Sequence, residues 1–139
     1  MAMALCAMLS SRLLANNLFV LPTFSGNATG TATVYSGNPL ASAGNFTTAS
    51  DAYLVLAKPA LNAADTKYYV ISRSGSNSLI ILNSAFTPIG TAISFGQNVT
   101  AAALTPDGAK LLVVAGNLRI YNTSTDTEIQ TQFLDVGLN

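Results

Sequence analysis

A repeated order of short apolar runs and turn residues limits the fold of this chain more than any other feature. The order is complete in the last third of the sequence, where strand, turn, strand, turn, strand, loop and strand follow one another: Ala101–Leu104, Thr105–Gly108, Leu111–Ala115, Gly116-Asn117, Leu118–Tyr121, Asn122–Thr127 and Glu128–Leu134. In the first turn Pro106 fixes φ, Asp107 can bond to the backbone two residues on, and Gly108 tolerates positive φ. Gly116 and Asn117 both tolerate the positive φ of a two-residue hairpin turn. The segment is therefore predicted to form a four-stranded antiparallel meander.

The same order recurs upstream. Lys67 precedes Lys110 by 43 residues, and Val34 precedes Ile81 by 47. Further apolar runs occupy the corresponding places: Leu18–Leu21, Ala32–Tyr35, Tyr53–Ala57, Tyr68–Ser72, Leu79–Leu82 and Ile89–Phe95. Four strands per unit at such a period are typical of a propeller, and a sandwich would not repeat its turn residues at a fixed spacing. We predict an all-β fold, a partial β-propeller with four-stranded antiparallel blades in an open arc: a partial blade at 16–47 and full blades at 48–97 and 98–139.

The last unit, AAALTPDGAKLLVVAGNLRIYNTSTDTEI, resembles the repeats of bacterial YVTN-type propellers. Those repeats run from a TPDG turn through a lysine and an apolar strand to a Tyr-Asn-Thr-like end and a Thr-rich loop. The resemblance is strongest over 99–134 and looser over the rest of 16–139. It departs from the pattern at Pro59–Asp65, which replaces the tight turn, and in the first blade, which has no clear first strand. It implies a fold, a repeat class and an exported or surface-associated protein, and it brings no common catalytic motif.

The N-terminal segment 1–15 reads as a signal peptide or an apolar N-terminal segment. Met1–Leu9 is a short apolar run followed by small and polar residues, although the basic residues that usually precede such a run are missing. Ser10, Ser11 and Arg12 interrupt it, so it is too short for a transmembrane helix, and we expect no integral membrane protein. The predicted location is secreted, periplasmic or cell surface.

Charge excludes several functions. Six Lys and Arg balance six Asp and Glu, and charged residues make up only 9% of the 139 residues. Phosphate binding depends on clustered basic residues, and those of this chain are scattered, so no nucleic-acid partner is expected.

The sequence has no histidine, which removes the commonest general base and metal ligand. The single cysteine, Cys6, permits no intrachain disulfide.

The remaining chemical groups are better explained by structure than by catalysis. Asp107 and Asp65 each precede a strand beside a lysine, as turn residues do. Asp126 and Glu128 are close in sequence and are expected in a solvated loop. The tyrosines lie in strand runs and are expected to pack there: Tyr35, Tyr53, Tyr68, Tyr69 and Tyr121. Four sites match the N-glycosylation sequon, which arises easily in a chain rich in Ser, Thr and Asn: Asn27, Asn45, Asn98 and Asn122. No catalytic, cofactor-binding or metal-ligating residue is assigned, and no cofactor is predicted.

Three function classes remain. The first is a non-catalytic exported propeller segment, an interaction scaffold for an unknown protein or carbohydrate. The second is part of a propeller enzyme, lactonase-like or quinoprotein-like, whose active site lies in further blades. The third is a structural cell-surface or adhesin module. Repeat units need stacked neighbours to bury their faces, so we expect the segment to belong to a longer propeller or a truncated product. Neighbouring blades or self-association would then cover its exposed faces.

Overall fold

The chain forms three antiparallel β-sheets. A computed structural model describes residues 17–21, 29–37, 39–49, 52–58, 65–72 and 77–132. Sheet 1 contains β1 (Leu18–Val20), β2 (Thr29–Ser36) and β3 (Ala41–Ala49). Sheet 2 contains β4 (Ala52–Lys58), β5 (Lys67–Ser72), β6 (Ser78–Leu82) and β7 (Ile93–Ser94). Sheet 3 contains β8 (Ala101–Leu104), β9 (Lys110–Ala115), β10 (Asn117–Asn122) and β11 (Thr127–Gln132).

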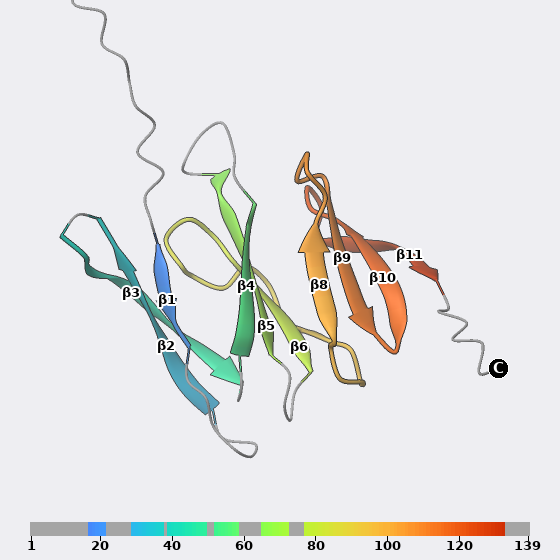
Figure 1. Ribbon diagram of the computed structural model, residues 1–139, viewed down its shortest axis with the longest axis horizontal. Helices are drawn as coiled ribbons and strands as arrows, with labels where there is room; N and C mark the ends of the chain where they lie inside the picture. Colours follow the sequence, from blue (N-terminus) through green and yellow to red (C-terminus); the bar gives the residue numbers. More distant parts are fainter. Residues whose placement is uncertain are drawn as a thin grey trace, which may run out of the picture.

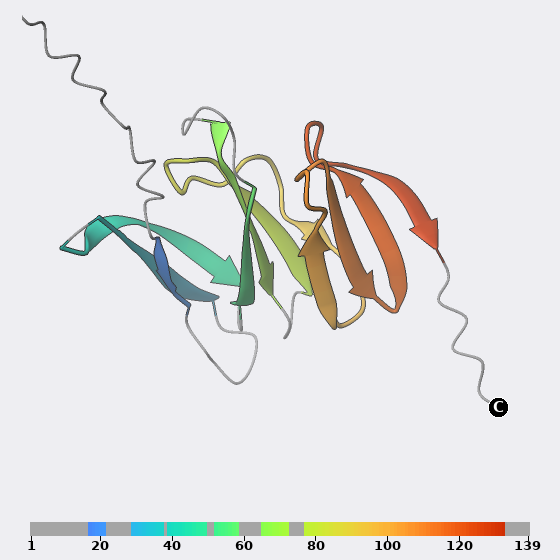
Figure 2. The ribbon, with the colours of Figure 1, turned by 45° about the horizontal axis from the view of Figure 1, so that its top comes forward.

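Each sheet is a meander in which neighbouring strands in the chain are neighbours in the sheet. The three sheets stand side by side in chain order, so that sheet 2 lies between sheets 1 and 3 (Figure 1). The same order is visible after rotation (Figure 2). The first strands of sheets 2 and 3, β4 and β8, contact each other. The molecule is thus a stack of sheets packed face to face.

Sheet 2 is buried on both faces because its central strands are apolar on both sides. In β5, Tyr69 and Ile71 join a core cluster with sheet 3, whereas Tyr68 and Val70 join another with sheet 1. All four side chains are 7% exposed or less. A continuous apolar run is what a strand covered on both faces requires. Full burial of a side chain of this size stabilises the fold by about 1.5–3 kcal/mol.

The core between sheets 1 and 2 is aromatic. Phe86 lies in the loop between β6 and β7. The centroid of its ring is 5.8 Å from the ring centroid of Phe19 of β1 and 5.2 Å from that of Tyr68 of β5. Phe19 also packs edge-on against Phe46 of β3 at 6.4 Å. Such tilted and edge-to-face pairs add about 0.5–1.5 kcal/mol beyond the area they bury. The first junction of the stack is therefore held by interlocking rings.

The all-β prediction is confirmed, and none of the three described sheets closes on itself. Some strand predictions are wrong. The run Ile89–Phe95 contributes only Ile93 and Ser94 to a strand, since Pro88 and Gly90 (φ 69°) precede them. β3 was not predicted, because its sequence ASAGNFTTA lacks an apolar alternation. The predicted segment 1–15 lies outside the described residues.

The turn between β9 and β10 also differs from the prediction. Gly116 has a φ of 71°, but Asn117 does not have positive φ and is already a strand residue paired with Ala115. One left-handed residue, rather than two, therefore reverses the chain. A Cβ on Gly116 would lie 1.7 Å from Oε1 of Gln97, but this oxygen is the end of a flexible, exposed side chain that could move away. The positive φ of Gly116 is therefore the stronger reason for glycine at this position.

Candidate functional site

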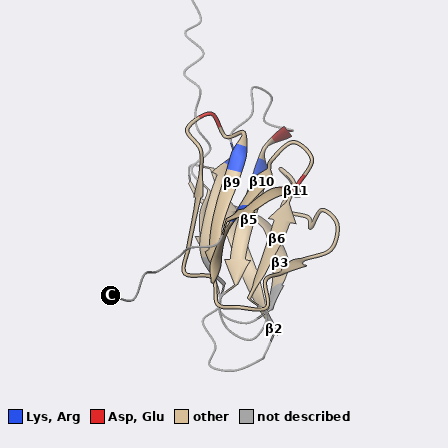
Figure 3. Ribbon diagram, turned by 90° about the vertical axis from the view of Figure 1, so that its right-hand side faces the viewer, with Lys and Arg blue, Asp and Glu red and all other residues tan. Residues whose placement is uncertain are grey.

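Most charged side chains of the described residues gather at one end of the strands (Figure 3). This end, which we call the charged end, carries three lysines and three aspartates: Lys58, Lys67, Lys110, Asp65, Asp107 and Asp126. Among these six described residues the two signs balance, so together they supply no net charge with which to attract a polyanion. Any chemistry here has to come from local contacts.

The turn from β8 to β9 is held by side chains at this end. The amide of Gly108 donates to the carbonyl of Thr105 at 2.7 Å, and Gly108 has a φ of 67°. Asp107 Oδ1 accepts from the Ala109 amide at 3.0 Å, the bond two residues on that the sequence predicts. The Thr105 hydroxyl donates to the same oxygen at 2.5 Å, and together these bonds lower the pKa of Asp107. Asp107 thus shapes a turn, with its carboxylate exposed to solvent.

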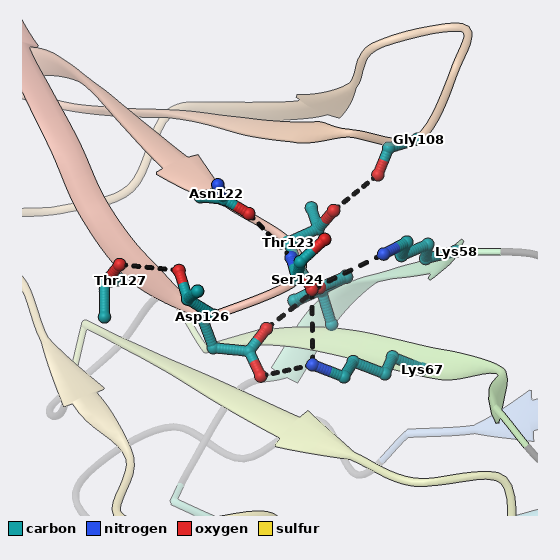
Figure 4. Close-up of polar contacts among 10 residues, drawn as sticks. Lys58, Lys67, Gly108, Asn122, Thr123, Ser124, Asp126 and Thr127 are labelled. Atoms are coloured by element: carbon teal, nitrogen blue, oxygen red, sulfur yellow. Dashed lines mark hydrogen bonds and ion pairs between the residues drawn. The ribbon is translucent and has the colours of Figure 1, made fainter.

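A polar cluster joins sheet 3 to sheet 2 at the charged end (Figure 4). Lys67 Nζ, on β5, lies 2.5 Å from Asp126 Oδ2 in the loop between β10 and β11. The same ammonium donates to the Thr123 carbonyl at 3.2 Å, and Lys58 Nζ reaches that oxygen at 3.5 Å. Tyr69 OH lies 3.2 Å from Asp126 Oδ1 and 3.4 Å from the Thr123 carbonyl. We call Lys58, Lys67, Tyr69, Thr123 and Asp126 the inter-sheet polar cluster.

The sequence of the β10–β11 loop explains how it presents these groups. Asn122 Oδ1 accepts from the Ser124 amide at 2.8 Å, and the Asn122 carbonyl accepts from the Asp126 amide at 2.8 Å. Asp126 has a φ of 57°, a conformation that Asp adopts more readily than most residues. The Thr123 hydroxyl is buried and donates to the Gly108 carbonyl at 2.6 Å. The loop is therefore fixed at both ends to sheet 3 while Asp126 reaches sheet 2.

The loop between β6 and β7 repeats this construction with other chemistry. Asn83 Oδ1 accepts from the amides of Ala85 and Thr87, and the Asn83 carbonyl accepts from the Phe86 amide. Phe86 has a φ of 61°, close to the φ of Asp126. Phe86 packs on sheet 1, the sheet before its own, and in the same way Asp126 contacts sheet 2, the sheet before its own. We call the loop before the last strand of each sheet its final loop. In sheets 2 and 3 the final loop fastens the sheet to the preceding one.

The groups of the inter-sheet polar cluster bond to one another. Both carboxylate oxygens of Asp126 accept bonds, one from Lys67 and one from Tyr69. Burial, and after it the negative charge of Asp126, raises the pKa of Tyr69, so the phenol stays protonated at the alkaline pH at which a free tyrosine ionises. A carboxylate, an ammonium and a phenol that satisfy one another act as a structural contact between sheets.

A second set of polar groups lies around Arg119 of β10. Its guanidinium carbon sits 5.4 Å from the ring centroid of Phe95, and Nη1 is 3.7 Å from Glu128 Oε2. Tyr121 OH donates to the same oxygen at 3.1 Å, and burial is the first cause of its raised pKa. Arg119 Nε is buried and has no partner among the described residues. The contacts of Arg119 and Tyr121 with Glu128 fix β11 onto β10. As in the inter-sheet polar cluster, the polar groups bond to one another.

The structure distributes the other candidate residues widely. Asp65 is exposed just before β5, and Asp126, expected in a solvated loop, has a side chain only 18% exposed. The tyrosines lie in β2, β4, β5 and β10. Asn45 and Asn98 are exposed, whereas Asn122 is half-buried and caps its loop; Asn27 lies outside the described residues. The contact between Lys67 and Asp126 was missed, although lysine recurs at the start of β5 and β9.

In comparisons with known proteins, the chain matches no protein-family model, no curated protein and no solved structure. Within the described ranges, no three His, Cys, Asp or Glu side chains gather in a way that could hold a metal ion. No helix in the described part of the chain is long and apolar enough to cross a membrane.

Proposed function

We propose that the chain is a segment of an exported β-propeller of the YVTN-repeat type, and that it serves as a non-catalytic scaffold for binding a protein or a carbohydrate. The observation that carries the proposal is the repeated junction between sheets. Sheet 2 is buried on both faces, and the final loops of sheets 2 and 3 each fasten to the preceding sheet at a residue of positive φ. Repeated junctions of this kind support a radial array of blades.

The charged end is the surface we assign to binding. Asp65, Asp107 and Lys110 are exposed there, and hydrogen bonds fix the turn that carries Asp107 and Lys110. Rigid polar groups of both signs without net charge suit a neutral, hydroxyl-rich or mixed-charge partner better than a polyanion. Binding groups are commonly carried on loops that a rigid scaffold positions.

The proposal is tested with the purified full chain, labelled and applied to a glycan array and to immobilised surface proteins of the source cell. We expect retention that Asp65→Asn with Lys110→Gln reduces at least tenfold and that Asn98→Asp, at the opposite end, leaves unchanged. Equal retention by both variants would reject the charged end as the binding surface. Turnover of lactones, or of alcohols with an added quinone cofactor, would favour a propeller enzyme instead.

A further inference from the structure

We draw no further inference here: the strongest candidate, the partly buried apolar patch on the outward side of β9 and β10 in sheet 3, carries none, because nothing in the described part of the chain shows what covers it.

Discussion

The contact between Lys67 and Asp126 should make a measurable contribution to stability. Two unit charges at about 4 Å attract by roughly 4 kcal/mol at an effective dielectric constant of about 20, before desolvation is subtracted. The side chains of Lys67 and Asp126 are 21% and 18% exposed. The pair therefore lies between surface ion pairs, which contribute little to stability, and fully buried ion pairs, whose disruption is costly. We therefore expect a coupling free energy of about 1–2 kcal/mol between them.

A double-mutant cycle measures this coupling. Lys67→Met keeps the apolar stem, and Asp126→Asn keeps an acceptor for Tyr69 and a residue type that tolerates positive φ. Unfolding in urea at pH 7 gives the stability of the wild type, both single variants and the double variant. The double variant should lose about 1–2 kcal/mol less than the two single losses together. The pair is mostly buried, so a substantial part of the coupling should persist in about 1 M salt.

The pair of Arg119 and Glu128 serves as the matched control within the same sheet. Its atoms are 3.7 Å apart and its side chains are 27% and 30% exposed, so the coupling should be at most about 0.5 kcal/mol. Additive losses for Lys67→Met and Asp126→Asn, or a coupling no larger than that of the control, would refute the conclusion that this contact joins the two sheets.

Three further outcomes are expected. Phe86→Ala should destabilise the protein by about 3 kcal/mol in urea unfolding, because it empties the aromatic junction with sheet 1; a loss below about 1 kcal/mol would contradict that packing. Gly108→Ala should cost about 1–2 kcal/mol through its φ of 67°, measured in the same way, and an unchanged midpoint would show that the turn adopts another conformation. The raised pKa of Tyr69 predicts that stability is intact below pH 10, where free tyrosine titrates, and falls above it, because the unfolded chain releases a proton that the folded chain retains. Tyr69→Phe should flatten that decline in alkaline unfolding curves, and an equal slope in both proteins would exclude Tyr69 as a source.

The sequence predicted the strands that are buried on both faces. The runs KYYVIS and SLIIL of β5 and β6 are apolar throughout, and both are strands in the structure. β3 could not be found in this way, since Phe46 is buried but Asn45 and Thr47 are exposed and most of its residues are small or polar. Its register with β2, from Thr29 opposite Ala49 to Ser36 opposite Ala41, determines it as a strand.

The candidate site was less predictable than the fold. Lys67 and Asp126 are 59 residues apart, and they meet only because sheets 2 and 3 stack. The turn at Asp107 was predictable because its contacts are local: Asp107 bonds to the amide of Ala109. The sequence pattern therefore specified the hydrogen bond within this turn, whereas the contacts between sheets depend on tertiary packing.

The final loops of sheets 2 and 3 share backbone features but differ in the side chain that contacts the preceding sheet. Phe86 makes an aromatic contact, whereas Asp126 makes an ionic one. Both residues have positive φ, and in both loops an earlier asparagine caps the loop. A unit can therefore exchange the side chain that contacts its neighbour, provided that the capping residue and the backbone path are kept. Mutational drift in these repeats should accordingly preserve the asparagines of the loops longer than the residues that make the junctions.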